Sequence, residues 1–329
     1  MKLKILLIFN YLIYYFILSS CHKSNNSNNS KSYSGPAQCN LSKSKSIMPQ
    51  IVGGNPVNGT TIPTGNNTVA ILLPLNSFET ILCSGTIVAN NLILTAGHCF
   101  DNVDQNNTSP GVVVFSNSFS NYTSSNSVNI NCWQRTSNYI PCSVDDSYNC
   151  ILNDIAWVKI NGTIKSGYSS VSILSNPTTI SNTETKTMIG FGDYNDSNGN
   201  TTLKNAVSVS SVTFPDTLPS GAASSFDSYT FSGAYENYLT VIGPDTGKGT
   251  CEGDSGGPVY VQRGGNYILA ALTQGSNSLL SPHPTTTSPP YSFNTSQYAS
   301  CSDGYGVYTT IGNYVNWIQS SSGVTLSLY

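Results

Sequence analysis

The chain has 329 residues and a formal net charge of −3, and only 9% of its residues are charged. This length suffices for one large β domain or two small ones. A slightly acidic chain offers no basic field to a phosphate backbone, so nucleic acid is excluded as a partner. Asn, Ser, Thr and Gly separate the short apolar runs, and their side chains compete with helices for backbone hydrogen bonds. The composition therefore predicts an all-β fold.

Residues 1–20 have the pattern of a signal peptide. Lys2 and Lys4 precede an apolar run at 5–18, which is too short for a stop-transfer helix. Residues 18–21, Leu-Ser-Ser-Cys, resemble the lipobox of bacterial lipoproteins, in which the cysteine becomes the lipidated first residue. We therefore expect a secreted protein that is lipid-anchored through Cys21 at the bacterial cell envelope. The alternative is ordinary cleavage near residue 20, which leaves the protein simply secreted.

The segment 21–50 is predicted to be a disordered tether or propeptide. It consists largely of Ser, Asn and Lys, and such a segment cannot bury enough apolar surface to offset its ordering entropy. The chain has nine cysteines. Setting Cys21 aside leaves an even number, which suits disulfides in an oxidising compartment.

Three short motifs contain residues suited to acyl transfer. Residues 253–258, Gly-Asp-Ser-Gly-Gly-Pro, hold Ser255 between glycines, where a tight turn can present its hydroxyl and expose neighbouring N–H groups. Residues 94–99 end an apolar run with His98, and residues 153–158 place Asp154 at the start of a buried strand. Taken singly, each motif also fits an ordinary turn or strand start.

The order of the three residues along the chain narrows the choice among classes of serine hydrolase. Besides His98, the histidines are His22 in the tether and His283 in a Pro-rich run, so His98 is the expected base. The order His98, Asp154, Ser255 is that of chymotrypsin-like enzymes and differs from those of subtilisins and α/β-hydrolases. The motif at 253–257 also fits a nucleophile elbow. That alternative is disfavoured because it needs an acid and then a histidine on alternating strands and helices after the serine.

Further motifs extend the match over residues 51–319, and together they resemble the trypsin and chymotrypsin family of serine proteases. They are Ile-Val-Gly-Gly at 51–54, Cys-Ser-Gly at 83–85 with Cys99, Gly-Phe-Gly at 190–192, Gly-Val-Tyr-Thr at 306–309 and Tyr-Val-Asn-Trp-Ile at 314–318. The resemblance implies two antiparallel six-stranded β-barrels, with the active site between them, and a C-terminal α-helix. Residues 51–319 would form this protease domain and 320–329 a C-terminal tail.

The resemblance also implies a serine endopeptidase that acts on proteins or peptides. Ser255 would attack the scissile carbonyl, His98 would take and return its proton, and Asp154 would orient His98. The N–H groups of Gly253 and Ser255 would form the oxyanion hole. No metal or cofactor is required, and we expect a monomer. The alternative is a catalytically silent binding module on the cell surface, but such homologues usually lose a triad residue or an oxyanion glycine.

The family pattern further implies a zymogen that is cleaved between Gln50 and Ile51. The new ammonium group of Ile51 would pair with Asp254, the acid beside the nucleophile. Residues 48–50, Met-Pro-Gln, contain no Lys or Arg, so the activating protease should differ from trypsin. Otherwise the enzyme accepts Gln at P1 and activates itself.

Alignment to Ser255 locates the S1 pocket, which binds the P1 side chain. Gly249 would lie at its base, where trypsin-like members carry Asp, so bulky apolar or aromatic P1 residues are expected rather than Lys or Arg. Gly275 and Gly306 would leave the wall open, and Thr250 could hydrogen-bond a neutral polar P1 side chain.

Three other positions near this pocket depart from the family or stay ambiguous. Glu252 would lie near the pocket mouth, or it is simply a solvated carboxylate. Thr273 stands where a serine usually hydrogen-bonds the catalytic aspartate. Gln274 replaces an expected Trp, and a Ser-, Pro- and Thr-rich insert follows at 276–300.

By the same resemblance, Cys83 pairs with Cys99 and Cys251 with Cys301. Four cysteines then remain, which can pair in three ways: Cys39, Cys132, Cys142 and Cys150. If Cys39 bonds one of the others, the propeptide would stay attached after cleavage.

Overall fold

The computed structural model describes residues 55–57, 63–74, 80–103, 111–139, 153–176, 180, 184–192, 205–209, 239–242, 249–251, 253–277 and 305–329. The predicted signal peptide, lipidation site and tether therefore lie outside these ranges. So do Ile51, Glu252, Cys301 and the insert beyond residue 277.

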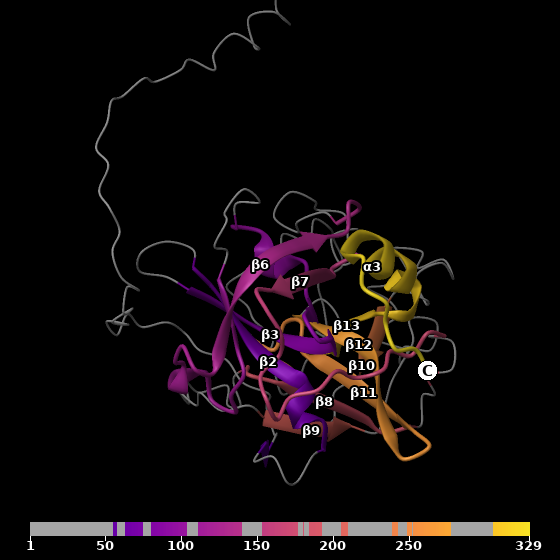
Figure 1. The fold of residues 1–329 in the computed structure, drawn as a ribbon. Coiled ribbons are helices and arrows are strands. Elements are labelled where there is room, and N and C mark those ends of the chain that lie inside the picture. The colour runs from indigo at the N-terminus through magenta and orange to yellow at the C-terminus, as the bar shows by residue number, and fades with distance from the viewer. Residues whose placement is uncertain are drawn as a thin grey trace, which may run out of the picture. The chain divides into compact units, whose positions relative to one another are not determined.

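Six strands form a closed antiparallel barrel in the order β2-β3-β4-β7-β6-β5. Figure 1 labels β2, β3, β6 and β7 among them. Their bounds are β2 Thr68–Pro74, β3 Thr80–Ala89, β4 Leu92–Thr95, β5 Val112–Val114, β6 Ser127–Arg135 and β7 Ala156–Ile160. β2 closes the barrel because it pairs with β3 on one side and with β5 on the other. This half confirms the predicted six-stranded barrel.

The barrel interior is filled by aliphatic side chains from facing strands, among them Val69, Ile71, Ile87 and Ile93, all fully buried. β4 is buried along its whole length, which is expected of a strand that is covered on both faces. Because successive side chains of a strand point to opposite faces, every second residue points into the barrel and little room is left at its centre. A side chain at Gly85 would overlap Ile71 and Ile93.

The second half forms a seven-stranded antiparallel sheet in the order β1-β9-β8-β11-β12-β13-β10. Its strands are β1 Asn55–Pro56, β8 Lys186–Gly190, β9 Asn205–Val209, β10 Leu239–Ile242, β11 Pro258–Arg263, β12 Asn266–Asn277 and β13 Tyr305–Thr310. The predicted second six-stranded barrel is not seen as a closed barrel in the part of the chain that the structure describes. β1 pairs with β9 at one edge of this sheet, and residues 210–238, between β9 and β10, lie outside the described ranges.

A second core joins the two halves. It contains Leu92 and Trp157 from the barrel, Tyr260 and Leu269 from the sheet, and Ile318 from the helix α3, Val315–Ser322. The indole N–H of Trp157 donates to Ser321 Oγ at 2.9 Å, which fixes α3 against β7. α3 ends at Gly323, whose φ of 68° is the left-handed conformation that glycine tolerates.

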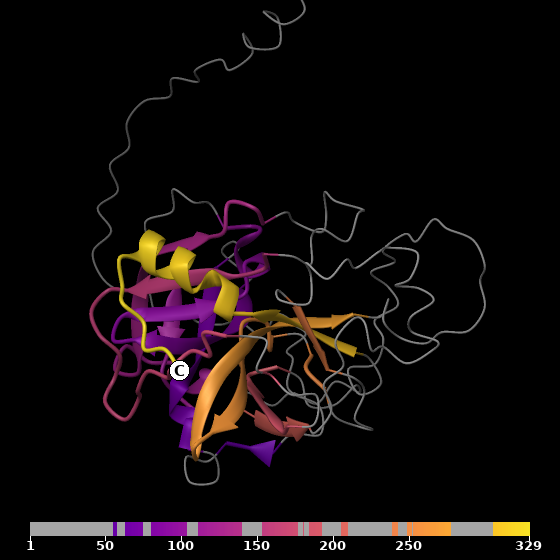
Figure 2. The ribbon, with the colours of Figure 1, turned by 90° about the vertical axis from the view of Figure 1, so that its right-hand side faces the viewer.

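The segment after α3 packs onto the domain instead of extending from it (Figure 2). Leu326 is buried, the amide of Tyr329 donates to the carbonyl of Ile173 at 2.8 Å, and Ile173 donates to Ser327 at 2.9 Å. Within the described ranges no helix has both the length and the apolar character needed to cross a membrane.

Candidate active site

His98 begins a one-turn 3-10 helix, η2 (His98–Phe100), directly after the buried strand β4 and Gly97. Its imidazole Nδ1 lies 2.7 Å from Asp154 Oδ2, and its backbone N–H donates to Asp154 Oδ1 at 2.7 Å. An ionised carboxylate can only accept hydrogen bonds, so Nδ1 carries the proton in this pair. The neutral ring then leaves Nε2 as an acceptor.

Asp154 approaches His98 because the backbone before β7 is held in an unusual conformation. Asn153 has a φ of 61°, which is uncommon for residues other than glycine but tolerated by Asn. Asp154 is 2% exposed, and its carbonyl accepts a hydrogen bond from Thr309 Oγ1 at 3.1 Å. A Cβ at Gly97 would come within 3.1 Å of Asp154 Oδ1, so glycine allows the close approach of the carboxylate.

Ser255 lies in the turn before β11 and is 9% exposed. Its Oγ lies 2.8 Å from Nε2 of His98 and donates to it in the tautomer argued above. Gly253 and Gly256 have φ values of 84° and 80°, so the turn depends on their left-handed conformations. The structure therefore brings together His98, Asp154 and Ser255, which the sequence separates by up to 157 residues.

The proton affinity of His98 results from opposing effects. Burial of the ring lowers the pKa of His98, but the charge of Asp154, the hydrogen bond to it and the charge of Asp101 together raise it above the ordinary value of 6.5. Its side chain remains 34% exposed. The ring can thus be reached from solvent while its protonated form is stabilised by two carboxylates.

A family model of trypsin matches residues 56–318, which is more than half of the chain. The chain belongs to the trypsin family. It is accordingly a serine endopeptidase.

Individual relatives agree with this membership. Trypsin-1 of Astacus astacus is 25% identical over 248 residues, which cover 74% of this chain and 90% of that protein. Trypsin delta of Drosophila melanogaster is 27% identical over 207 residues, or 61% of this chain and 72% of the relative. A solved structure described as "Structure of GrC" matches with a TM-score of 0.58 and 15% identity over 83% of this chain and all of that chain, which bears on the fold alone.

The two amides predicted to form the oxyanion hole of this trypsin-family protein flank Asp254. Neither the N–H of Gly253 nor that of Ser255 donates to any residue that the structure describes. The Gly253 carbonyl, in contrast, accepts from Ser84 Oγ at 2.9 Å, and Ser84 N–H donates to the carbonyl of Ser255 at 2.8 Å. Ser84 thus ties the turn to β3 of the barrel and leaves the two amides available.

Asp254, the acid expected to receive the new amino terminus, is fully buried. Its Oδ1 accepts from Gly192 N–H at 2.6 Å and its Oδ2 from Cys251 N–H at 2.9 Å. Side chains at Gly190 or Gly192 would overlap the Asp254 carboxylate. Ile51 lies outside the described ranges.

The predicted pocket residues gather at one end of β12 and β13. Gly275 pairs in register with Val307, next to the pair formed by Ser276 and Gly306. A Cβ at Gly275 would meet no atom of the described residues within 4 Å. Gly249, the expected pocket base, is half-buried.

Of the two pocket hydroxyl groups considered, that of Thr250 stays a candidate for P1 binding, whereas the bond expected of Thr273 needs correction. The buried Thr250 Oγ1 already lies 3.0 Å from the hydroxyl of Tyr308, so its hydrogen-bonding capacity is shared with the protein. The buried Thr273 Oγ1 has no hydrogen-bond partner among the described residues, so the expected bond to Asp154 is absent. Threonine carries a methyl group that serine lacks, which restricts the rotamer on a strand and turns the hydroxyl elsewhere.

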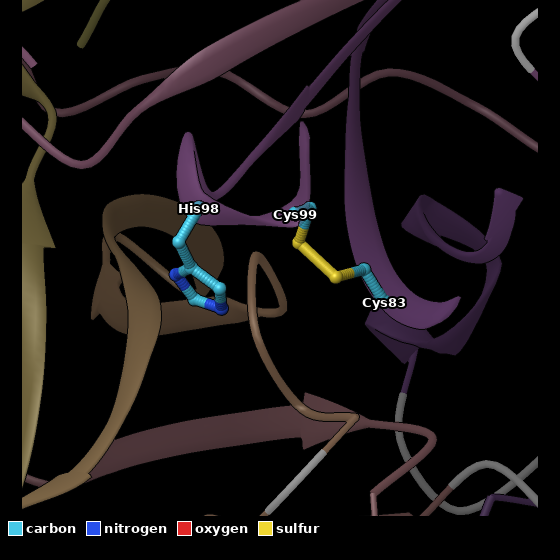
Figure 3. A group of neighbouring side chains, drawn as sticks. All are labelled: Cys83, His98 and Cys99. Carbon is cyan, nitrogen blue, oxygen red and sulfur yellow. A yellow bond between two sulfur atoms is a disulfide. The ribbon is translucent and has the colours of Figure 1, made fainter. Parts of the chain in front are cut away.

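Cys83 and Cys99 form the predicted disulfide beside His98, as Figure 3 shows. The ligand atoms of Cys83, His98 and Cys99 lie within 4.8 Å of one another. A cysteine binds a metal ion as its thiolate, and these two sulfurs are joined in a disulfide, which leaves His98 as a single ligand of this group, so the group does not form a metal site. It serves instead to fix the turn that carries His98.

The other cysteines are only partly described. Cys251 is disulfide-bonded, while its predicted partner Cys301 falls in a range that is not described. Cys132 is an exposed free thiol. Each of the three pairings left open uses Cys132, so none of them is complete in this structure; Cys39, Cys142 and Cys150 lie beyond its described ranges.

Sequence reasoning missed two groups of residues that support the site. Ser84 was noted only as part of a cysteine motif, and nothing in its spacing signals a bond to a turn that lies 169 residues away. Asp101 and Tyr139 were also missed. Asp101 lies only three residues after His98, and that proximity was the available signal.

Proposed function

We propose that this chain hydrolyses peptide bonds through an acyl-enzyme intermediate on Ser255. The observation that supports the proposal is one unbroken line of contacts: Asp154 Oδ2 to His98 Nδ1 at 2.7 Å, and His98 Nε2 to Ser255 Oγ at 2.8 Å. These distances lie within the range needed for proton transfer between a nucleophile and its base.

In the first step Ser255 Oγ attacks the scissile carbonyl carbon and its proton passes to Nε2 of His98. Asp154 holds the ring and stabilises the imidazolium. The oxyanion that forms accepts hydrogen bonds from the N–H groups of Gly253 and Ser255. His98 then protonates the leaving amine as the C–N bond breaks. Water hydrolyses the acyl-enzyme by the same sequence of proton transfers.

Peptide hydrolysis by single variants tests these roles. We expect Ser255→Ala and His98→Ala to lower kcat by several orders of magnitude, and Asp154→Asn by on the order of 10⁴-fold, because an amide favours the wrong tautomer of His98. Circular dichroism should show folded protein in each case. Hydrolysis by Ser255→Ala at the wild-type rate would refute the proposal.

Activation by cleavage before Ile51 is proposed because Asp254, a fully buried acid, directly precedes Ser255. An ammonium group from a new amino terminus would place an opposite charge beside this carboxylate and so couple cleavage to the shape of the nucleophile turn. Replacing residues 46–50 with an enterokinase site allows controlled release of Ile51. Activity should rise upon cleavage and fall as the α-amino group, with an ordinary pKa of about 8, deprotonates at alkaline pH. Full activity before cleavage would contradict this proposal.

For specificity we propose P1 residues without positive charge. Gly249 brings no carboxylate to the pocket base, and the Thr250 hydroxyl is partly engaged by Tyr308. The open side of Gly275 leaves space for a bulky side chain. A peptide library read by mass spectrometry should show cleavage after aromatic or large apolar residues. Cleavage mainly after Lys or Arg would show that another carboxylate reaches the pocket.

The proposed location is the bacterial cell envelope, through lipid on Cys21. Substituting Cys21→Ser should move the protein from the membrane fraction to the soluble fraction. If the wild-type protein is already soluble and has an unmodified amino terminus, it is secreted without a lipid anchor, which would contradict the proposed location.

A further inference from the structure

Three residues near the catalytic pair form a cluster that peptide hydrolysis as described above does not use. Asp101 caps η2, and its backbone N–H donates to the carbonyl of His98 at 3.0 Å. The hydroxyl of Tyr139 lies 3.0 Å from each oxygen of the Asp101 carboxylate. Arg135 Nη1 donates to Asp101 Oδ1 at 2.8 Å, and its guanidinium lies 4.6 Å from the centre of the Tyr139 ring.

The turn that follows β6, which carries Tyr139, also touches the backbone that carries Asp154. Thr136 Oγ1 donates to the carbonyl of Asn153 at 2.9 Å, and Asn153 Nδ2 donates to the carbonyl of Asn138 at 3.3 Å. The Tyr139 ring and Asp154 Oδ1 flank the same glycine, Gly97: a Cβ there would lie 3.3 Å from one and 3.1 Å from the other. One short turn thus contacts both segments that supply the catalytic pair.

We propose that Asp101, Arg135 and Tyr139 are positioning residues, which lock the His98 turn to the Asp154 segment and fix the Asp101 carboxylate on the turn that carries His98. This inference rests on the proposed role of His98 as the base. None of the three residues reaches Ser255 through a contact in the described structure, so they act through His98 and Asp154.

The charges around His98 agree with this arrangement. Among the described residues, Asp154 before β7 and Asp101 at the end of η2 are the charged groups that raise the pKa of His98. Tyr139 is 8% exposed, and its burial together with the two carboxylates raises its own pKa. The phenol therefore stays protonated and acts as a donor to Asp101, while Arg135 restrains the carboxylate from the solvent side.

The titration midpoint of His98 tests the positioning role of the cluster, and it can be measured in a protein without activity. The chain has three histidines, so ¹³C-histidine labelling of the Ser255→Ala protein gives a spectrum that His98→Ala assigns. We expect Asp101→Asn to move the titration midpoint of His98 to lower pH, because one stabilising negative charge is lost. Glu184→Gln is the matched control, since Glu184 forms a comparable ion pair with Arg263 in the second sheet, and it should leave the midpoint unchanged.

Kinetics with the Ser255 enzyme supply the second readout. In Asp101→Asn the acidic limb of kcat/KM should move to lower pH along with the midpoint. Tyr139→Phe keeps the ring against Gly97 but removes both contacts to Asp101. It should lower kcat about tenfold, because small misplacements of a base are costly, with KM nearly unchanged.

The two hypotheses fail in different ways. An unshifted His98 midpoint in Asp101→Asn, or a Tyr139→Phe enzyme with wild-type kcat, overturns the positioning role even if the protease is active. Hydrolysis that survives in Ser255→Ala overturns the proposed function instead and leaves the titration result intact.

Discussion

At the scale of single residues, the proposed role of His98 as the base makes its acid–base behaviour set the pH range of the enzyme. Its pKa is raised above 6.5 in the folded chain, and only the neutral ring can accept the Ser255 proton. We therefore predict that kcat/KM falls as the pH decreases, with a midpoint above 6.5 in a pH–rate profile. A midpoint below 6.5 would mean that burial outweighs the two carboxylates.

The same raised pKa links pH to stability, with a defined sign. The folded state binds a proton more tightly than the unfolded chain, so His98 contributes stability below about pH 6.5. This contribution is lost as the pH rises through the folded-state pKa. The free energies of unfolding of the Ser255→Ala and His98→Ala/Ser255→Ala proteins, measured in urea, should differ more at pH 5.5 than at pH 8.5. An equal difference at both values would argue against the charge effect.

Gly192 is predicted to be essential for the shape of the nucleophile turn. In Gly192→Ala the new methyl group would overlap the Asp254 carboxylate, which the Gly192 N–H now binds at 2.6 Å. Overpacking of this kind costs about 1–3 kcal/mol, and we expect activity to fall further because Asp254 precedes Ser255. Gly275→Ala is the control, since a Cβ there meets no described atom. Its free energy of unfolding should stay at the wild-type value, whereas equal losses in the two variants would contradict the prediction.

Residue types and their order were sufficient to predict which three residues meet at the site. The orientation of supporting side chains was not predictable, because it depends on rotamers and on turns that touch only after folding. Thr273 shows this plainly: its hydroxyl is present where the family pattern needs it, yet it makes no bond to Asp154. Tyr139 contacts Asp101 across 38 residues of sequence, and no local motif encodes that distance.

At the scale of secondary structure elements, a disulfide joins β3 to η2. Cys83 and Cys99 are separated by 16 residues, and closing a loop of this length contributes about 3 kcal/mol in the chain-entropy account. Cys83→Ala/Cys99→Ala should lower the free energy of unfolding by about that amount, measured in urea. Since the bond also fixes the turn of His98, kcat should drop as well. An unchanged kcat in the folded variant would show that β4 alone positions His98.

The residues that follow α3, which were predicted to be a C-terminal tail, pack against the rest of the domain in the structure. Leu326 is buried, and the backbone of residues 327–329 pairs with residues 173–175. Removing residues 324–329 should therefore lower the free energy of unfolding by about 2–3 kcal/mol, mostly from lost burial of Leu326. Leu328→Ala, at a position that is largely exposed, should have little effect. If truncation left the unfolding transition unchanged, the packing of this segment would not matter for stability.

Strands were easier to predict from the sequence than their closure into barrels. Short apolar runs between Asn-, Ser- and Gly-rich turns indicated an antiparallel β fold, and the first barrel closes as expected. In the second half, β1 pairs with β9 at one edge of the sheet. That pairing is long-range, so no local pattern predicts it.

At the scale of the whole protease domain, the site is assembled from both halves. His98 and Asp154 belong to the closed barrel, Ser255 precedes β11 of the second sheet, and Ser84 of β3 bonds to both carbonyls that flank Asp254. The shared core, which includes Leu92, Tyr260 and Ile318, holds the two halves together. We predict that Ser84→Ala loses activity more than stability, because the turn, rather than the core, loses its anchor. Kinetics and urea unfolding of the same sample would separate the two effects, and loss of stability alone would contradict the role assigned to Ser84.

The central claim is that His98 activates Ser255 as a nucleophile, and labelling with a fluorophosphonate probe tests it most directly. The probe forms a covalent bond only with an activated serine hydroxyl, and mass spectrometry of the digested protein identifies the residue. The account predicts one probe per activated chain, attached at Ser255, with labelling nearly abolished in Ser255→Ala and in His98→Ala. Labelling at another residue, or an undiminished rate in His98→Ala, would contradict it.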